Sequence, residues 1–223
     1  MRYLTNGTAT AVALALLAST LLAVEADARV VLATRGPSYH AAPSTHEIVL
    51  EGGLAEPMGD QDEPYFDSLV GFGSGTGYQL GARWRQYLGE FFAVSPVFQY
   101  TRFGTDTGVN GGIPYYRRTS MYRYGVDFHA FAGGGGSPMR LFLTGGVALA
   151  NNRLRDEDDI SYFQSSVNAP AYSAGIGLKM RNVELVGEYT YNRFDTSKFD
   201  PDGIQRSYNW DYLIVRAGIS FGR

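Results

Sequence analysis

The chain has 223 residues and a formal net charge of −3, and it contains no cysteine. A balance this close to neutral does not favour nucleic-acid binding, and the lack of cysteine excludes disulfides, thiol nucleophiles and cysteine-based metal sites. Charged residues make up only 18% of the chain, below the ~25% typical of soluble domains. Lys179 and Lys198 are the only lysines, which is unusual for a surface that faces water.

The N-terminus predicts export. Residues 8–24 are almost wholly small or apolar, they follow a single positive charge at Arg2, and they lead to the small-x-small sequence Ala26-Asp27-Ala28. The strongly apolar part is shorter than the ~20 residues that a membrane-spanning helix needs. We therefore expect a signal peptide over residues 1–28, a short N-terminal extension over residues 29–45 and a barrel domain over residues 46–223.

An alternation of apolar with polar or small side chains runs through eight segments. In the last segment Leu213, Val215 and Ile219 occupy one set of alternate positions, which we call one parity. Arg216 and Gly218 occupy the other parity. Successive side chains of a strand point to opposite faces, so each segment predicts a strand with one apolar face. Each is roughly ten residues long, the length that a tilted strand needs to cross a bilayer. The segments are 47–54, 78–85, 92–101, 122–129, 141–149, 172–179, 183–192 and 213–221.

The connections between these segments are alternately short and long. Residues 88–91, 133–138 and 181–182 form the short ones, and residues 56–75, 104–119, 151–170 and 195–207 form the long ones. This predicts an all-β, eight-stranded antiparallel up-and-down barrel in the outer membrane, with four extracellular loops and both termini in the periplasm. Pro96 cannot donate to a strand ladder, so we expect a bulge or a late strand start there.

Two closed barrels fit eight alternating strands: a soluble barrel with its apolar parity inside, and a membrane barrel with that parity facing lipid. The polar parity carries equal numbers of acids and bases, and much of the rest of it is Gly, Ser or Thr, as a narrow lumen requires. Buried charges must be paired, so the membrane interpretation predicts an interior ion-pair network and no open pore. Its members would be Glu47, Glu51, Arg83, Arg85, Arg123, Asp127, Lys179, Glu184, Glu188 and Arg216.

The final strand carries a family resemblance. Arg216, Gly218 and Phe221 match the polar residue, glycine and aromatic residue that end the last strand of the eight-stranded bacterial outer-membrane barrels. The chain therefore resembles the OmpA-like, OmpX-like and opacity-type barrels over about residues 47–221. The resemblance implies that Gly218 and Phe221 belong to a signal for the barrel assembly machinery, although Arg223 stands where a terminal aromatic residue is usual.

No catalytic site, cofactor or metal site is expected. His129 and Asp127 share the polar parity of one segment, and a paired interior histidine is the simplest interpretation. Lipid A deacylases resemble this barrel but carry a serine two residues after such a histidine, where this chain has Phe131. The acidic runs Asp156–Asp159 and Asp60, Asp62 and Glu63 lack the spacing of a calcium loop, and they predict solvated loops.

The long connections mix aromatic residues with arginine, which binding surfaces favour. The second has Tyr115-Tyr116-Arg117-Arg118. The same residues near a strand mouth could instead belong to an aromatic girdle. The residues concerned around the fourth loop are Tyr191, Phe194, Phe199, Tyr208 and Trp210.

The sequence thus favours a non-enzymatic, monomeric outer-membrane barrel that displays four loops and serves envelope integrity or surface adhesion. Its expected partners are outer-membrane lipids, lipopolysaccharide, the assembly machinery and a host or surface ligand. A small channel for apolar solutes and a lipid A-modifying enzyme remain open alternatives, because fold and function are separable.

Overall fold

The computed structural model describes residues 46–62, 72–110, 113–132, 137–158, 162–200 and 203–222. All of them belong to one compact unit that runs from Pro43 to Arg223. The predicted signal peptide, over residues 1–28, and the N-terminal extension, over residues 29–45, lie outside the described residues. Within the described ranges, no helix is long and apolar enough to span a bilayer.

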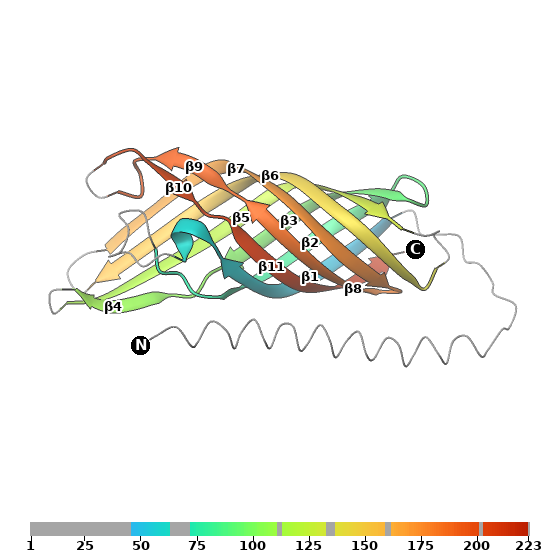
Figure 1. The fold of residues 1–223 in the computed structure, drawn as a ribbon, viewed down its shortest axis with the longest axis horizontal. Coiled ribbons are helices and arrows are strands. Elements are labelled where there is room, and N and C mark those ends of the chain that lie inside the picture. The colour runs from blue at the N-terminus through green and yellow to red at the C-terminus, as the bar shows by residue number, and fades with distance from the viewer. Residues whose placement is uncertain are drawn as a thin grey trace, which may run out of the picture. The chain divides into compact units, whose positions relative to one another are not determined.

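Eight antiparallel strands close into an up-and-down barrel, as predicted (Figure 1). Each strand pairs with the next in the chain, and the first pairs with the last, with Leu50 opposite Ile219. Within the closed part of the barrel no sheet edge is free, whereas strand β4 (Asp106–Asn110) and residues 162–171 extend beyond it with one side unpaired. The barrel strands are β1 (His46–Pro57), β2 (Gly77–Tyr87), β3 (Phe92–Arg102), β5 (Ile113–Phe131), β6 (Met139–Asp158), β7 (Tyr162–Met180), β8 (Val183–Tyr191) and β11 (Tyr212–Gly222).

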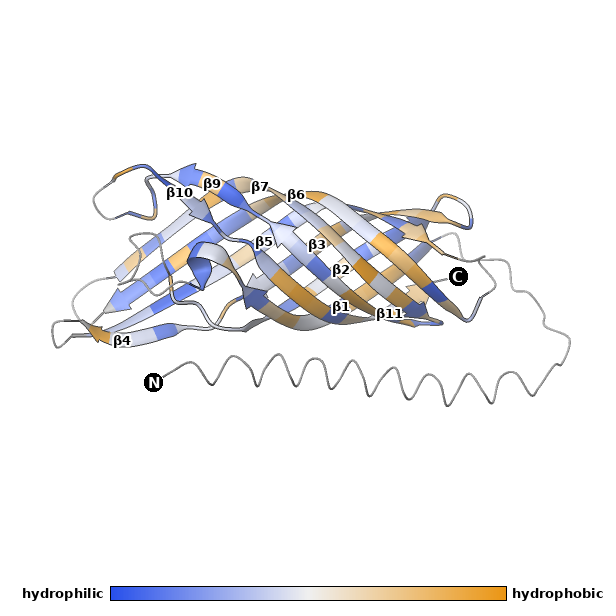
Figure 2. Cartoon of the chain, viewed as in Figure 1, coloured by the Kyte–Doolittle hydropathy of each residue, from blue (hydrophilic) through white to orange (hydrophobic). Residues whose placement is uncertain are grey.

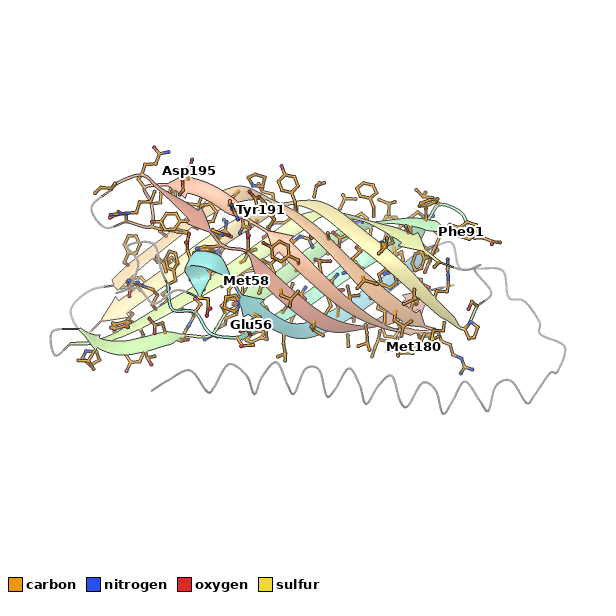
Figure 3. The ribbon with its side chains drawn as sticks, in the orientation of Figure 1. Glu56, Met58, Phe91, Met180, Tyr191 and Asp195 are labelled. Atoms are coloured by element: carbon orange, nitrogen blue, oxygen red, sulfur yellow. The ribbon has the colours of Figure 1, made fainter. Side chains whose placement is uncertain are left out.

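The remaining elements lie in the connections at one end of the barrel. Strand β4 (Asp106–Asn110) pairs with the start of β5, and β9 (Arg193–Thr196) and β10 (Arg206–Asn209) form a separate hairpin. The 3₁₀-helix η1 (Gly59–Gln61) follows β1. We call this end the long-loop end. The opposite, short-turn end carries the connections β2–β3, β5–β6 and β7–β8, where Figure 3 places Phe91 and Met180.

The alternation assigns the two faces as predicted. The apolar parity points outward on every barrel strand, and Leu80, Leu143, Ile176 and Phe221 are each more than half exposed. The polar parity is buried inside. Figure 2 shows the apolar colour gathered on the part of the barrel nearer the short-turn end, with hydrophilic colour towards β4, β9 and β10. The barrel therefore has an apolar outer belt and a polar interior.

Two of the predicted long loops are wrong in their secondary structure. Strands β5, β6 and β7 are 19, 20 and 19 residues long, so most of residues 104–119 and 151–170 lie in strands rather than loops. Beyond Leu149 both faces of β6 become largely polar, and the apolar-to-polar contrast that reveals a strand disappears. The backbone ladder continues nevertheless, because it needs only a paired neighbour.

Pro96 forms neither the bulge nor the late strand start that the sequence suggested. Strand β3 begins at Phe92, and the β2–β3 ladder stops after Arg83–Val97 and resumes in the same register at Gln86–Val94. Pro96 still lies opposite Val126 of β5. Its ring removes a donor on one side but keeps an extended φ, so the ladder has a local gap without a shift.

The seam between β1 and β11 leaves no room for a side chain at Gly53. A Cβ there would meet the carbonyl oxygen of Val215 and come within 2.6 Å of Arg216 Cα. We expect Gly53→Ala to strain the seam and lower the free energy of unfolding by about 1–3 kcal/mol. Gly52→Ala is the control, because its Cβ would have its nearest neighbour, on Leu80, at 3.4 Å. Urea unfolding in detergent micelles measures both, and equal stability would contradict this account of the seam.

Candidate functional site

The ten charged residues predicted for the interior all lie inside the barrel, each less than 10% exposed. Alternation along the strands points them to the axis, and the structure brings them together in two groups. Six form a closed ring of alternating charge: Glu51, Arg83, Asp127, Arg123, Glu188 and Arg216. Four form a second group nearer the short-turn end: Glu47, Arg85, Lys179 and Glu184.

Each acid of the ring contacts two arginines. Glu51 lies 2.6 Å from Arg83 and 3.1 Å from Arg216. Glu188 lies 2.7 Å from Arg216 and 3.4 Å from Arg123. Asp127 completes the ring, at 2.7 Å from Arg123 and 3.7 Å from Arg83. Three acids and three bases therefore cancel.

Neutral side chains and a glycine complete the ring. Gln99 of β3 donates to Glu51 and accepts from Arg123, each at 2.7 Å. Arg123 also donates to Ser173 of β7 at 2.8 Å. On β6, a Cβ at Gly146 would collide with Asp127 Oδ1 and lie 2.5 Å from Arg123 Nη2, so a larger residue there would displace members of the ring. All eight strands thus contribute to this cross-section of the lumen.

The second group is also neutral. Arg85 lies 2.8 Å from Glu184 and 3.4 Å from Glu47, and Lys179 donates to Glu47 at 2.9 Å. The Tyr87 hydroxyl donates to the same carboxylate at 3.0 Å. The Arg85 guanidinium lies 5.6 Å from the ring centres of Phe131 and Phe142. These two rings belong to an apolar cluster that closes the short-turn side of the interior. The residues of this closure are Ala93, Phe131, Phe142 and Val186.

Apolar side chains fill the lumen on the other side of the ring. Along β11 the successive inward positions are Arg216 in the ring, then Ile214 and Tyr212, which are fully buried. These two pack in a cluster with residues from β1, β5, β6 and β7. The cluster is Ala55, Phe103, Met121, Ala150, Ala171, Tyr212 and Ile214.

An aromatic cap closes the long-loop end. Trp210 is fully buried, stacks on Phe199 at 5.3 Å between ring centres and meets Phe72 edge-on at 5.2 Å. Phe194 stacks on Tyr208 at 5.7 Å. Neither sequence interpretation of the loop aromatics, binding surface or girdle, holds for these buried rings, whereas Tyr191 does face outward. The cap is Phe72, Phe194, Phe199, Tyr208 and Trp210, with Leu154 and Ala169 packed against it.

The interior holds a histidine contact that the sequence did not reveal. His129 Nε2 lies 2.9 Å from Ser95 Oγ, so a hydroxyl and an imidazole meet as in a nucleophile–base pair. Both residues are almost completely buried, and His129 Nδ1 has no hydrogen-bond partner to orient it among the described residues. The pair forms because Ser95 and Asp127 are opposite in the β3–β5 register, with His129 the next inward residue. Spacing along the chain carries no sign of it.

The second loop is a hairpin whose charges pair locally. Arg117 is buried and ion-pairs with Asp156 of the acidic run. Tyr115 donates to Asp106 at 3.2 Å, and partial burial, followed by that carboxylate, raises the pKa of Tyr115. Tyr116 is half exposed.

The acidic runs do not form a metal site in the part of the chain that the structure describes. Across those residues, no three metal-ligating side chains come together. Asp159 and Glu63 lie outside the described residues.

The residues of the implied assembly signal lie on both faces of β11. Phe221 is exposed on the outer belt, Gly218 is inside beside Val49 and Glu184, and Arg216 belongs to the ring. Arg223 lies outside the described residues. A role in assembly for Gly218 and Phe221 stays a prediction.

No protein-family profile matches the sequence, and no curated protein matches it. Solved outer-membrane proteins do resemble it in fold. Ail, the attachment invasion locus protein of Yersinia pestis, is 12% identical over 81% of this chain and 100% of Ail, with a TM-score of 0.49. Neisserial surface protein A is 14% identical over 81% of this chain and 100% of its own, with a TM-score of 0.47.

A major outer membrane protein from Thermus thermophilus is 15% identical over 79% of this chain and 99% of its own, with a TM-score of 0.48. Similarity at this level concerns the fold and not the function. The closed eight-stranded barrel, which the sequence indicated, is established by the chain's own strand pairings.

The ring makes a prediction about stability. Glu188→Gln removes a buried carboxylate from between Arg216 and Arg123, and we expect it to destabilise the barrel by about 3–5 kcal/mol, because an uncompensated charge remains inside. Glu157→Gln makes the same change in an exposed pair with Arg155 and should cost at most about 1 kcal/mol. Urea unfolding measures both. Equal, small losses would show that the ring does not stabilise the fold.

Proposed function

We propose that the protein is a non-enzymatic, monomeric outer-membrane barrel that presents its long-loop end at the cell surface and serves envelope integrity or surface contact. The observation that carries this proposal is the apolar outer belt. All eight barrel strands contribute exposed apolar side chains to it, whereas the charges inside the barrel are paired. A soluble barrel would have the opposite arrangement.

The belt has the dimensions of a bilayer crossing. On β6 the outward apolar side chains run from Met139 to Leu149, about eleven residues, which matches the ~9–11 that a tilted strand needs. Tyrosine rings with a polar tip lie at its long-loop edge, the position that favours the headgroup level. They are Tyr78, Tyr100, Tyr122 and Tyr189.

The orientation follows from the connections. Barrels of this class have short periplasmic turns and longer extracellular loops. Both ends of the barrel, His46 and Gly222, lie at the short-turn end, where Glu47 pairs with Gly222 across the seam. We therefore place both termini in the periplasm, consistent with export behind a signal peptide. Insertion would then involve the barrel assembly machinery, with Phe221 part of the signal.

The filled interior favours a structural role for the barrel rather than a role as a channel or an enzyme. The ion-pair ring crosses the lumen, apolar clusters lie on both sides of it, and the aromatic cap covers the long-loop end. Ser95 and His129 are buried among these side chains, without an orienting acid on His129 Nδ1 among the described residues. A substrate would have to displace packed aromatic rings to reach them.

A charge placed on the belt tests the membrane assignment. Leu143 is 61% exposed, and we expect Leu143→Arg to destabilise the protein in phospholipid vesicles by about 2–4 kcal/mol. Thr107→Arg, on the exposed face of β4, should have little effect. Unfolding is followed by heat-modifiable gel migration. Recovery of the unmodified protein from the soluble periplasmic fraction would overturn the assignment.

Shortening the hairpins that do not form the cap tests surface contact. Replacing residues 106–117 or residues 157–162 by a tight turn should leave heat-modifiable migration intact, because the ring and the cap are untouched. Adherence of cells that produce the protein should fall if these hairpins make the contact. Unchanged adherence together with an envelope defect on gene deletion would leave envelope integrity as the role.

A further inference from the structure

Four arginines lie directly above the apolar belt on one side of the barrel. On β3 the outward positions pass from Tyr100 to Arg102, and on β5 they pass from Tyr122 through Ser120 to Arg118. On β6, beyond the belt, two successive outward positions are Arg153 and Arg155. We call these residues the arginine shelf: Arg102, Arg118, Arg153 and Arg155.

The strand register brings the members of the shelf together. Ser120 lies opposite Arg102 on one side and opposite Arg153 on the other. Arg118 lies directly opposite Arg155. Like charges opposite one another destabilise a sheet. An anion between them would remove this cost.

The shelf has an excess of positive charge. Arg155 donates to Glu157 at 3.0 Å, the one ion pair that the shelf makes with the described residues. Arg153 donates instead to the side-chain amide oxygen of Asn151 at 2.7 Å, and its guanidinium lies 4.4 Å from the Tyr122 ring centre. Four guanidinium groups therefore face a single carboxylate.

The shelf lines a cleft of about 190 Å³. Its other polar lining groups are Ser120 and Gln164, and Tyr100 and Tyr122 connect it to the belt. Since a water molecule occupies ~30 Å³, the cleft has room for a phosphate group. The planar fork of arginine matches phosphate oxygens with two parallel hydrogen bonds.

We propose that the arginine shelf binds the phosphate group of a phosphorylated glycolipid in the outer leaflet, whose acyl chains lie along the belt below. This rests on the proposed function, because it needs the belt to be in the membrane. A lipid fits better than a soluble polyanion, since acids outnumber bases above the shelf, with Asp106, Asp156 and Glu157 against Arg117. An extended polyanion would meet these acids, whereas a lipid headgroup stops below them.

The barrel supplies a matched control. Arg193 also follows an outward-facing tyrosine, with its guanidinium 4.8 Å from the Tyr191 ring centre, and it is similarly exposed. It differs in lying 3.6 Å from the carboxylate of Asp211. Arg193→Gln therefore removes an arginine at the same edge without touching the shelf.

The test uses the full chain reconstituted in phosphatidylcholine nanodiscs that contain either bis-phosphorylated or dephosphorylated lipid A. Native mass spectrometry measures the retained lipid A. We expect preferential retention of the phosphorylated form, and an R153Q/R155Q variant should weaken it at least about tenfold, the effect of one lost charge-assisted bond. R193Q should retain it as the unmodified protein does. S120E, which keeps all four arginines but places an acid in the cleft, should weaken it similarly.

The other outcomes are distinct. Equal retention of both lipid forms, or equal loss in R193Q, would overturn the phosphate site while leaving the barrel in the membrane. Full displacement by millimolar inorganic phosphate would make the shelf a free-anion site, and tighter binding of a sulfated polysaccharide would make it a polyanion site; either overturns the lipid. Failure of the chain to insert, seen as absent heat-modifiable migration, would instead overturn the proposed function.

Discussion

The structure depends on burying charged side chains in neutral groups inside a narrow closed sheet. Arg216 on the last strand pairs with Glu51 on the first, so the ring of six charges crosses the seam where the barrel closes. A one-residue slip would turn every side chain of a strand to the other face, exposing charge to lipid and leaving its partner unpaired. The hydrogen-bonded ladder closes the sheet, and the ring fixes the register in which it closes.

Filling the lumen with this ring has a consequence for function. Apolar clusters lie on both sides of the ring, and the aromatic cap covers the long-loop end. The charged side chains of the interior contact one another, and the apolar ones pack in clusters. The surfaces left for recognition are the outer belt, its edge and the loop tips. Both proposals about function therefore concern the outside of the barrel.

The sequence predicted those features that depend on parity alone. Alternation identified eight strands, their outer face and all ten interior charges, because a side chain's face follows from its position in the strand. It could not predict which acid meets which base, since Glu51 and Arg216 come from opposite ends of the chain and meet only through the register of the seam. The Ser95–His129 contact needed the β3–β5 register in the same way. The cap was missed because its residues lie in loops and in the four-residue strands β9 and β10, which are too short for alternation to be recognised.

Arginine has different surroundings on the two faces of the sheet. The comparison separates the arginines that stabilise the fold from those that we propose bind a ligand. Inside, the three arginines of the ring each contact two carboxylates, as burial demands. Outside, Arg102, Arg118 and Arg153 stand at the edge of the belt without such partners among the described residues. No ion pair with the described residues offsets these three cations on adjacent strands, and Arg118 lies directly opposite Arg155. In the orientation proposed above, the phosphate groups of the headgroup layer supply the negative charge at that level.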